Sequence, residues 1–385
     1  MTTTAVPRFL DVHVLQTLPY SNVNRDDLGS PKSMVFGGTT RTRVSSQAWK
    51  RPTRLAVEEA IGEQAVRTRR LPQQVTSELT SGERGWPQEL AELAGAQVIR
   101  SAETKLALEK GDRSTASLLF LPDSAVTELA DLAQEHRPAL EKALGNRAAS
   151  AKALLPKDAV HEVLRSRNGS IALFGRMLAE IPGAGVDGAV QVAHAFTTHS
   201  TSVQADFFTA VDDADKWATD AGSAHMNTGE FSSGVFYRYA TLDLDSLTKS
   251  INDPATARTL ADAFVTAFIN SLPGAKKTST APHTPPDLVH LSVRSDRPLS
   301  LAAAFEEPVR AREKGWGTVS RTALSDYADR VGKLLGTAGV VHSAYAGIDD
   351  EKRPGLGQRT ASYPALVAEA ITAVWPQAGQ DSKGA

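Results

Sequence analysis

Residues 24–54 read NRDDLGSPKSMVFGGTTRTRVSSQAWKRPTR, and they carry the most informative pattern in the chain. The stretch begins with a turn-forming Asn-Arg-Asp-Asp and passes through the flexible pair Gly37 and Gly38. It ends in a series of cations that no acidic residue interrupts: Arg41, Arg43, Lys50, Arg51 and Arg54. This combination indicates a folded basic surface, and the rest of the chain is interpreted outward from it.

The basic residues are spaced so that they share faces. Arg41 and Arg43 are two residues apart, so on an extended segment they point to the same side. Ser45 or Ser46 is expected to cap a following helix through its hydroxyl. On that helix one face carries residues at spacings of three and four: Gln47, Lys50, Arg51 and Arg54. Pro52 lies inside the predicted helix and is expected to kink or shorten it.

Glycines, hydroxyls, a helix N-terminus and aligned cations together predict a surface for successive phosphates. The alternative is a solvated, positively charged helix face without a partner. The glycine pair and the SSQ sequence favour the phosphate interpretation, because they add backbone and hydroxyl donors to the cations.

The composition limits the classes of function. The chain has 385 residues, 41% hydrophobic and 22% charged, which is ordinary for a globular protein of two or three domain-sized units. Its formal net charge is -2, so any polyanion must be held by a local patch. The absence of cysteine excludes disulfides, thiolate zinc sites and cysteine nucleophiles. No window approaches the roughly 18–20 apolar residues of a membrane span, and a cytoplasmic protein is expected.

Hydrophobic periodicity predicts a mixed fold. Residues 8–18 alternate as a central strand, on which His13 is expected to be a hydrogen-bonded structural histidine. Residues 53–165 have helical spacing and are interpreted as an inserted helical subdomain, and residues 170–178 return to strand character. With the later strands and helices, this order is compatible with an α+β fold built on a ferredoxin-like sheet, the scaffold of RNA-recognition modules.

Residues 194–230 are interpreted as an exposed excursion of strand, loop and strand. Its tip region, ADFFTAVDD, presents Phe207, Phe208 and Thr209, and exposed aromatic residues there suggest insertion between bases or into a partner. A second hypothesis is a metal-dependent phosphodiesterase that uses His194, His199, Asp206 and Asp212. A third is a nicotinamide site at the G-x-G-x-x-G match of residues 183–188, which would need a strand directly before the first glycine.

The chain resembles the CasC-type backbone subunit of Cascade, the type I-E CRISPR surveillance complex. The resemblance is carried by motifs that follow one another along most of the chain: NRDD at 24–27, FGG at 36–38, R-x-R-x-S-S-Q at 41–47, K-R at 50–51, GRM at 175–177, H-A-x-T-T-H at 194–199, D-x-F-T-A-V-D-D at 206–213, GSAH at 222–225, EFSSGVFYRYA at 230–240, PGAK at 273–276 and PLS at 298–300. Residues 60–165 carry little of it.

The resemblance implies a ferredoxin-like (RRM-like) palm with inserted helical fingers and a protruding thumb loop. The expected boundaries are a palm at 1–58, 169–195 and 231–379, fingers at 59–168, a thumb at 196–230 and a flexible tail at 380–385. It also implies a non-catalytic subunit, several copies of which polymerise along the crRNA and present its bases to target DNA. Other Cascade subunits and a recruited helicase-nuclease are the further partners, and no catalytic residue, metal or cofactor is expected.

The resemblance also assigns roles to single residues. The basic stretch is expected to hold RNA phosphates through Arg41, Arg43, Ser45, Ser46, Gln47, Lys50 and Arg51, and Arg54 joins them by the helix-face argument. Arg176 and Met177 are expected against the RNA near a displaced base. Phe207, Phe208 and Thr209 are assigned to the thumb tip, and Lys276 to a backbone contact.

Overall fold

The computed structural model describes residues 6–211, 223–311 and 315–376. The chain divides into two compact units, one formed by residues 1–57, 190–248 and 254–385, and the other by residues 58–189 and 249–253. In the described residues, no helix combines the length and apolar character that a membrane crossing needs.

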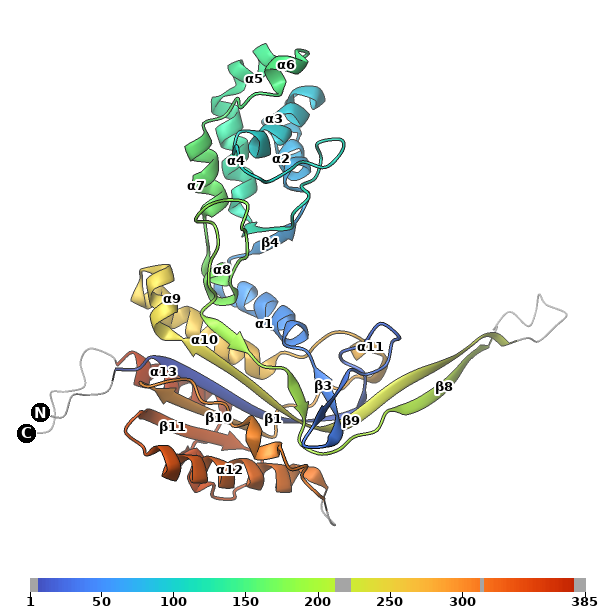
Figure 1. Ribbon diagram of the computed structural model, residues 1–385, viewed down its shortest axis with the longest axis vertical. Helices are drawn as coiled ribbons and strands as arrows, with labels where there is room; N and C mark the ends of the chain where they lie inside the picture. The colour runs from blue at the N-terminus through green and yellow to red at the C-terminus, as the bar shows by residue number, and fades with distance from the viewer. Residues whose placement is uncertain (1–5, 212–222, 312–314, 377–385) are drawn as a thin grey trace, which may run out of the picture. The chain divides into compact units, whose positions relative to one another are not determined.

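The first unit is built on a mixed sheet with helices on both faces (Figure 1). Its strands are β1 (Phe9–Ser21), β2 (Ser33–Phe36), β3 (Thr39–Val44), β6 (Val190–Val192), β7 (Ala195–Thr197), β8 (Gln204–Val211), β9 (Ser223–Asp243), β10 (Leu288–Arg294), β11 (Val340–Gly347) and β12 (Gln358–Arg359). Its helices are α1 (Ser46–Ile61, whose last residues belong to the second unit), α9 (Leu244–Ile251), α10 (Pro254–Asn270), α11 (Lys277–Thr280), α12 (Trp316–Leu335) and α13 (Tyr363–Val374), with short 3₁₀ turns at Ala302–Phe305 and Pro354–Leu356.

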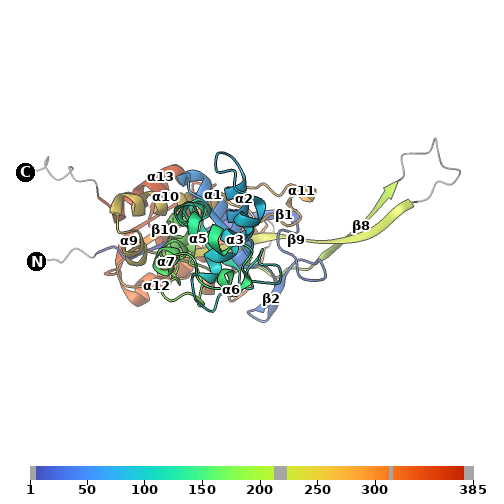
Figure 2. The same ribbon diagram turned by 90° about the horizontal axis from the view of Figure 1, so that it is seen from above.

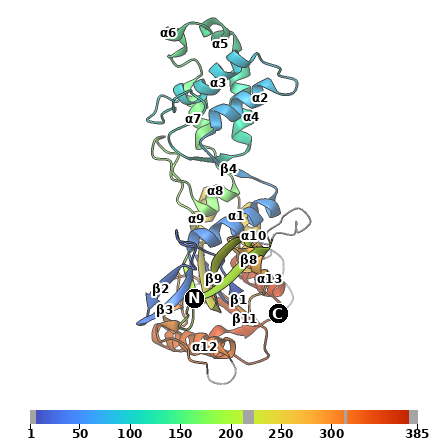
Figure 3. The ribbon, with the colours of Figure 1, turned by 90° about the vertical axis from the view of Figure 1, so that its right-hand side faces the viewer.

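The predicted central strand is confirmed. Among the described residues the sheet order is β12-β11-β10-β1-β9-β7-β3-β2, and β6 and β8 also pair with β9. β1 is antiparallel to both of its neighbours, β9 and β10, and almost all of its side chains are buried. Figure 3 shows α1 and α10 on one face of this sheet and α12 on the other, which explains why β1 is buried on both sides.

His13 is structural, as expected. It is 1% exposed, and its Nδ1 lies 2.9 Å from the Tyr237 hydroxyl. Asp11, two residues earlier on the same side of β1, accepts hydrogen bonds from the Tyr239 hydroxyl and the Leu299 amide, both at 2.9 Å. Burial raises the pKa of Asp11 to about 6. These polar groups are satisfied within the layer between the sheet and α12.

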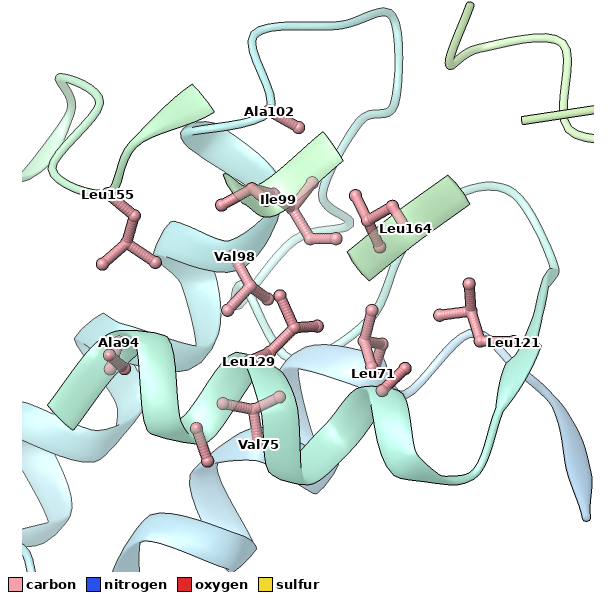
Figure 4. Packing of buried hydrophobic residues seen from close by; sticks show 14 of the residues in the cluster. Leu71, Val75, Ala94, Val98, Ile99, Ala102, Leu121, Leu129, Leu155 and Leu164 are labelled. Carbon is pink, nitrogen blue, oxygen red and sulfur yellow. The ribbon is translucent and has the colours of Figure 1, made fainter. Parts of the chain in front are cut away.

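The second unit is mainly helical, as the spacing of residues 53–165 predicted. It contains α2 (Leu71–Thr80), α3 (Gln88–Arg100), α4 (Ser124–Glu135), α5 (Arg137–Ala143), α6 (Arg147–Ser150), α7 (Lys157–Arg165), α8 (Gly169–Phe174) and the antiparallel pair β4 (Ala65–Thr68) and β5 (Leu119–Pro122). Its core packs leucine, valine and isoleucine side chains from α2, α3, α4, α7 and β5 (Figure 4).

The strand predicted at residues 170–178 is wrong. Gly169–Phe174 forms helix α8, which the Asn168 side chain caps by accepting a hydrogen bond from the Ile171 amide at 3.1 Å. A short, fully buried apolar run does not distinguish a strand from a helix by periodicity. Residues 169–189, expected in the palm, are grouped with the second unit, because Leu178, Ile181 and Ala184 join its core.

The predicted excursion contains a β-hairpin of β8 and β9 (Figure 2). Phe207 and Phe208 lie on β8 opposite Thr228 and Asn227, so they belong to a strand and not to a loop tip. Because successive residues of a strand point to opposite sides, a hairpin with one buried face would bury one of them. Phe207 is 64% exposed and Phe208 47% exposed, so both faces of the hairpin are open.

Leu129→Ala is expected to lower the free energy of unfolding of the helical unit by about 2–5 kcal/mol, because Leu129 is fully buried in its core. The measurement is urea denaturation followed by circular dichroism. Leu118→Ala is the control, since Leu118 is 57% exposed and its truncation should change stability by less than about 0.5 kcal/mol. Equal effects of the two substitutions would contradict this packing.

Candidate nucleic-acid interface

The basic stretch begins with a β2–β3 hairpin that is closed by the two glycines. Gly37 and Gly38 have φ angles of 58° and 72°, the left-handed values that a two-residue type I′ turn requires at both positions. A Cβ atom on Gly37 would lie 1.6 Å from the Glu306 carbonyl oxygen, so a side chain is excluded there by contact as well as by conformation. The FGG motif is therefore explained by the turn and by its close approach to residue 306.

Arg41 is a structural residue, which corrects its assignment as a phosphate ligand. Its side chain is fully buried, and its guanidinium donates to the carbonyls of Thr197 at 2.9 Å, Phe305 at 3.0 Å and Glu306 at 3.4 Å. Burial lowers the pKa of Arg41. The alternation of side chains predicted that Arg41 and Arg43 share one side of the strand. It could not show that residues 305–306 cover this side at Arg41, while Arg43 stays partly exposed.

Helix α1 presents the polar face that the sequence predicted. Gln47 and Arg51 are exposed, and Lys50 and Arg54 are partly exposed. The opposite face is buried through Trp49, Thr53 and Val57. Pro52 was expected to kink or shorten this helix. It does not shorten the helix, because α1 continues from Ser46 to Ile61 with Pro52 inside it. Arg54 is therefore carried on the same helix as Lys50 and Arg51.

The start of α1 is fixed by residues from distant parts of the chain. The Ser45 amide donates to Asn24 Oδ1, and the Ser46 amide donates to His194 Nδ1, both at 2.8 Å. The Ser45 carbonyl accepts from the amides of Ala48 and Trp49. Ser45 is buried, which corrects its assignment as a phosphate ligand, while Ser46 is partly exposed.

A buried cation lies beneath α1 and was not predicted as part of this site. The Arg238 guanidinium stacks 3.8 Å from the Trp49 ring centroid and 4.7 Å from that of Phe268. It donates to Gln16 Oε1 at 2.7 Å and to the Phe268 carbonyl. Burial lowers the pKa of Arg238 to about 9. The alternation of residues 235–240 places Arg238 among apolar side chains, and this pattern could have predicted its burial.

In the second unit, Arg176 is also structural, which corrects its assignment to the RNA surface. It is 4% exposed, and its guanidinium donates to the carbonyls of Ala184 and Ser166 at 2.8 Å and Arg165 at 2.9 Å. Burial lowers its pKa to about 10. The neighbouring Met177 is 91% exposed. Arg176 also forms a two-way backbone bridge with Val186, so Met177 is displayed from a well-tied segment.

The G-x-G-x-x-G match is explained by packing, and the nicotinamide interpretation is wrong. A Cβ atom on Gly188 would lie 2.6 Å from the Gly175 amide nitrogen, so this glycine permits a backbone contact. The glycine segment lies between helix α8 and the short strand β6. A dinucleotide fold requires a strand immediately before the first glycine and a helix after it.

The metal hypothesis required His194, His199, Asp206 and Asp212, and one of its histidines is already engaged. His199 is 1% exposed and stacked on Trp316 at 3.8 Å; its Nε2 accepts from the Val235 amide and its Nδ1 lies 2.9 Å from the Ser200 carbonyl. Because both ring nitrogens are occupied, His199 is not available as a ligand, and this hypothesis is wrong. Asp212 lies outside the described residues, and among the described residues no group of metal-binding side chains is found.

Lys276 lies at the base of the β8–β9 hairpin. Its amide donates to the Asn22 carbonyl at 3.0 Å, and its Nζ lies 5.0 Å from the Phe231 ring centroid. Asn22 also donates to the Glu230 carbonyl at 2.9 Å. The hairpin base is thereby connected to the residues that precede the NRDD turn. The side chain of Lys276 is partly exposed and can still reach an anion.

Comparison with known proteins places the chain in a family. A family model described as CT1975-like protein matches residues 10–370. The chain belongs to the CT1975-like family. A search of curated proteins found no match to this CT1975-like chain.

Two solved structures are similar to this CT1975-like chain. A chain of a CRISPR RNA-guided surveillance complex, pre-nicking, is 46% identical with a TM-score of 0.89, covering 95% of this chain and 100% of that one. A chain of a CRISPR RNA-guided surveillance complex is 40% identical with a TM-score of 0.78, covering 95% and 99%. The similarity thus extends over both units.

In this CT1975-like chain, Arg41→Lys is expected to lower the free energy of unfolding by roughly 1–3 kcal/mol, because an ammonium cannot satisfy the buried carbonyls that the guanidinium reaches. Thermal and urea denaturation measure the loss. Arg43→Lys, two residues away and partly exposed, is the matched control and should have little effect on stability. If Arg41→Lys were as stable as the wild type, the anchoring role of Arg41 would be refuted.

Proposed function

We propose that the protein is a CasC-type backbone subunit of a type I-E CRISPR surveillance complex. Several copies polymerise along one crRNA, hold its phosphate backbone and present its bases for pairing with target DNA. The subunit has no catalytic role and needs no metal or cofactor. The proposal is supported by the family membership and by similarity to chains of RNA-guided surveillance complexes.

The observation that carries the proposal is the exposed polar face of helix α1, built from Gln47, Lys50, Arg51 and Arg54. Cations and amides at this spacing suit a phosphate backbone, which carries one negative charge per nucleotide. Phosphate contacts fix the register of a nucleic acid without reading its sequence. Sequence recognition is then left to pairing between the guide and its target, as in other RNA-guided effectors.

The sheet of the first unit supports the palm assignment. The adjacent strands β10-β1-β9-β7 are antiparallel, with α1 in the connection from β1 to β7 and α10 in the connection from β9 to β10. This is the connectivity of a ferredoxin-like, RRM-like sheet. The second unit corresponds to the fingers, and residues 196–230 correspond to the thumb.

Two exposed apolar features fit the displacement of bases. Met177 is displayed from the second unit, and a flexible thioether side chain packs well against a base. Phe207 and Phe208 project from the hairpin with Thr209 beside them, and aromatic side chains can stack on or separate bases. We assign Met177 to a contact near a displaced base and the hairpin to the thumb that reaches a neighbouring copy.

The remaining partners follow from the same assignment. Besides the crRNA and copies of itself, they are target DNA through guide pairing, other Cascade subunits and a recruited helicase-nuclease. Lys276 adds a backbone contact near the hairpin base. The complex works in the cytoplasm.

The double variant Lys50→Ala with Arg51→Ala is expected to lower the affinity for RNA and to make that affinity less dependent on salt concentration. The slope of log K against log salt concentration should become shallower by roughly 0.7 for each lost phosphate contact. Fluorescence anisotropy with a labelled single-stranded RNA measures the affinity over a series of salt concentrations.

The matched control for this variant is Arg330→Ala with Lys333→Ala, which likewise removes one arginine and one lysine, here from α12. The control should retain the wild-type slope, because α12 covers the other face of the sheet (Figure 3). An affinity of the wild-type protein that does not change with salt would refute the proposed function.

Assembly provides an independent test. Co-expressed with a crRNA, the wild-type protein is expected to give a particle whose native mass corresponds to several copies per RNA. Phe207→Ser with Phe208→Ser should reduce the number of copies, while Val203→Ser, another exposed apolar position near the hairpin, should not. A particle with one copy per RNA, or equal masses for all three proteins, would contradict the polymerisation model.

A further inference from the structure

His194 occupies a position at the N-terminus of α1 where a serine hydroxyl would be expected. It lies in the short turn between β6 and β7, and its Nδ1 accepts a hydrogen bond from the Ser46 amide at 2.8 Å. A histidine from a distant segment thus replaces the local side chain that usually satisfies a first-turn amide. The contact leaves the other side of the imidazole ring directed away from the helix start.

The hydrogen bond fixes the tautomer of His194. Because the Ser46 amide donates to Nδ1, the ring proton must be on Nε2. Partial burial, followed by the charges of Arg43 and Lys32, lowers the pKa of His194. The ring is therefore neutral at pH 7 and offers one N–H donor.

The Nε2–H group of His194 is available to donate a hydrogen bond to a ligand. The His194 side chain is exposed, and in the described part of the chain this N–H has no hydrogen-bond partner. Two cations lie near the ring, Arg43 on β3 and Lys32 just before β2, and both act on its pKa. The ring also contacts Ser46, which directly precedes the Gln47–Arg51 face of α1. Such surroundings favour an anionic acceptor.

We propose that His194 donates its Nε2 proton to a non-bridging phosphate oxygen of the RNA held along α1, while its Nδ1 fixes the start of that helix. This inference rests on the proposed function. The contact is a neutral hydrogen bond, which distinguishes it from the contacts of Lys50 and Arg51. Its loss should weaken RNA binding without changing the number of counterions that binding releases.

A purely structural role for His194 makes a different prediction, and His194→Asn separates the two. The amide oxygen of asparagine can replace Nδ1 as the acceptor for the Ser46 amide, but asparagine has no group at the position of Nε2. His194→Ala removes both interactions. His194→Gln retains an N–H donor near the position of Nε2.

The experiment measures anisotropy of a fluorescein-labelled single-stranded RNA with the full-length variants, together with their melting temperatures. His194→Asn should keep the wild-type melting temperature and salt slope but bind about 3- to 10-fold more weakly, the effect of one neutral hydrogen bond. His194→Gln should bind more tightly than His194→Ala at every salt concentration.

Wild-type affinity of His194→Asn at an unchanged melting temperature would overturn the proposal and leave His194 as a helix cap only. If His194→Asn is destabilised, the comparison of His194→Gln with His194→Ala decides, and equal affinities of those two overturn the proposal. The Lys50→Ala with Arg51→Ala variant keeps the tests distinct. If it shows a reduced salt slope while His194→Asn binds normally, the RNA interface stands and only the role of His194 is lost.

Discussion

The guanidinium of Arg238 is the constraint on which the basic surface depends. It is enclosed by Trp49 of α1, Phe268 of α10 and Gln16 of β1, so it joins two helices to the centre of the sheet. A buried cation is tolerated only where aromatic faces and carbonyl oxygens replace water. Because Trp49 occupies the buried face of α1, this contact fixes the rotation of the helix about its axis. The polar face that carries Lys50 and Arg51 is exposed as a consequence.

The basic residues divide into buried ones that stabilise the fold and solvent-accessible ones that make up the basic surface. Arg41, Arg176 and Arg238 bind backbone carbonyls or aromatic rings inside the two units, whereas Arg43, Lys50, Arg51 and Arg54 are reached by solvent. Sequence spacing identified the helix face correctly, because the period of a helix determines which residues are neighbours. It could not separate Arg41 from Arg43, because what covers Arg41 is residues 305–306, far away in the sequence. Motif resemblance had the same limit at Arg176, whose acceptors come from residues 120, 165, 166 and 184.

The fold was predictable where periodicity and length agreed. The central strand β1 and the helical character of residues 53–165 followed from their patterns. The continuity of β9 across residue 230, where a boundary between thumb and palm was expected, was not predicted. The segment 169–174 was misassigned, because a short run with five buried residues fits either a helix turn or a strand. Only the side-chain cap from Asn168 and the positive φ of Gly175 distinguish the two. The role of His194 was hidden for a related reason. Its partner, Ser46, is 148 residues away, and no local pattern indicates that pairing.

Strand β9 has a mechanical consequence for the projecting hairpin. Residues 234–243 pair with β1 in the middle of the sheet, and residues 223–231 of the same strand pair with β8. The projection is thus a continuation of the sheet's own backbone, without an intervening loop to act as a hinge. A one-residue slip of β9 would invert every side chain along both halves, so the reach of the hairpin is set by the register inside the sheet. The distance between the sheet and the end of the described hairpin is therefore fixed by backbone hydrogen bonds. A neighbouring molecule that contacts the hairpin would be held at a fixed distance from the sheet.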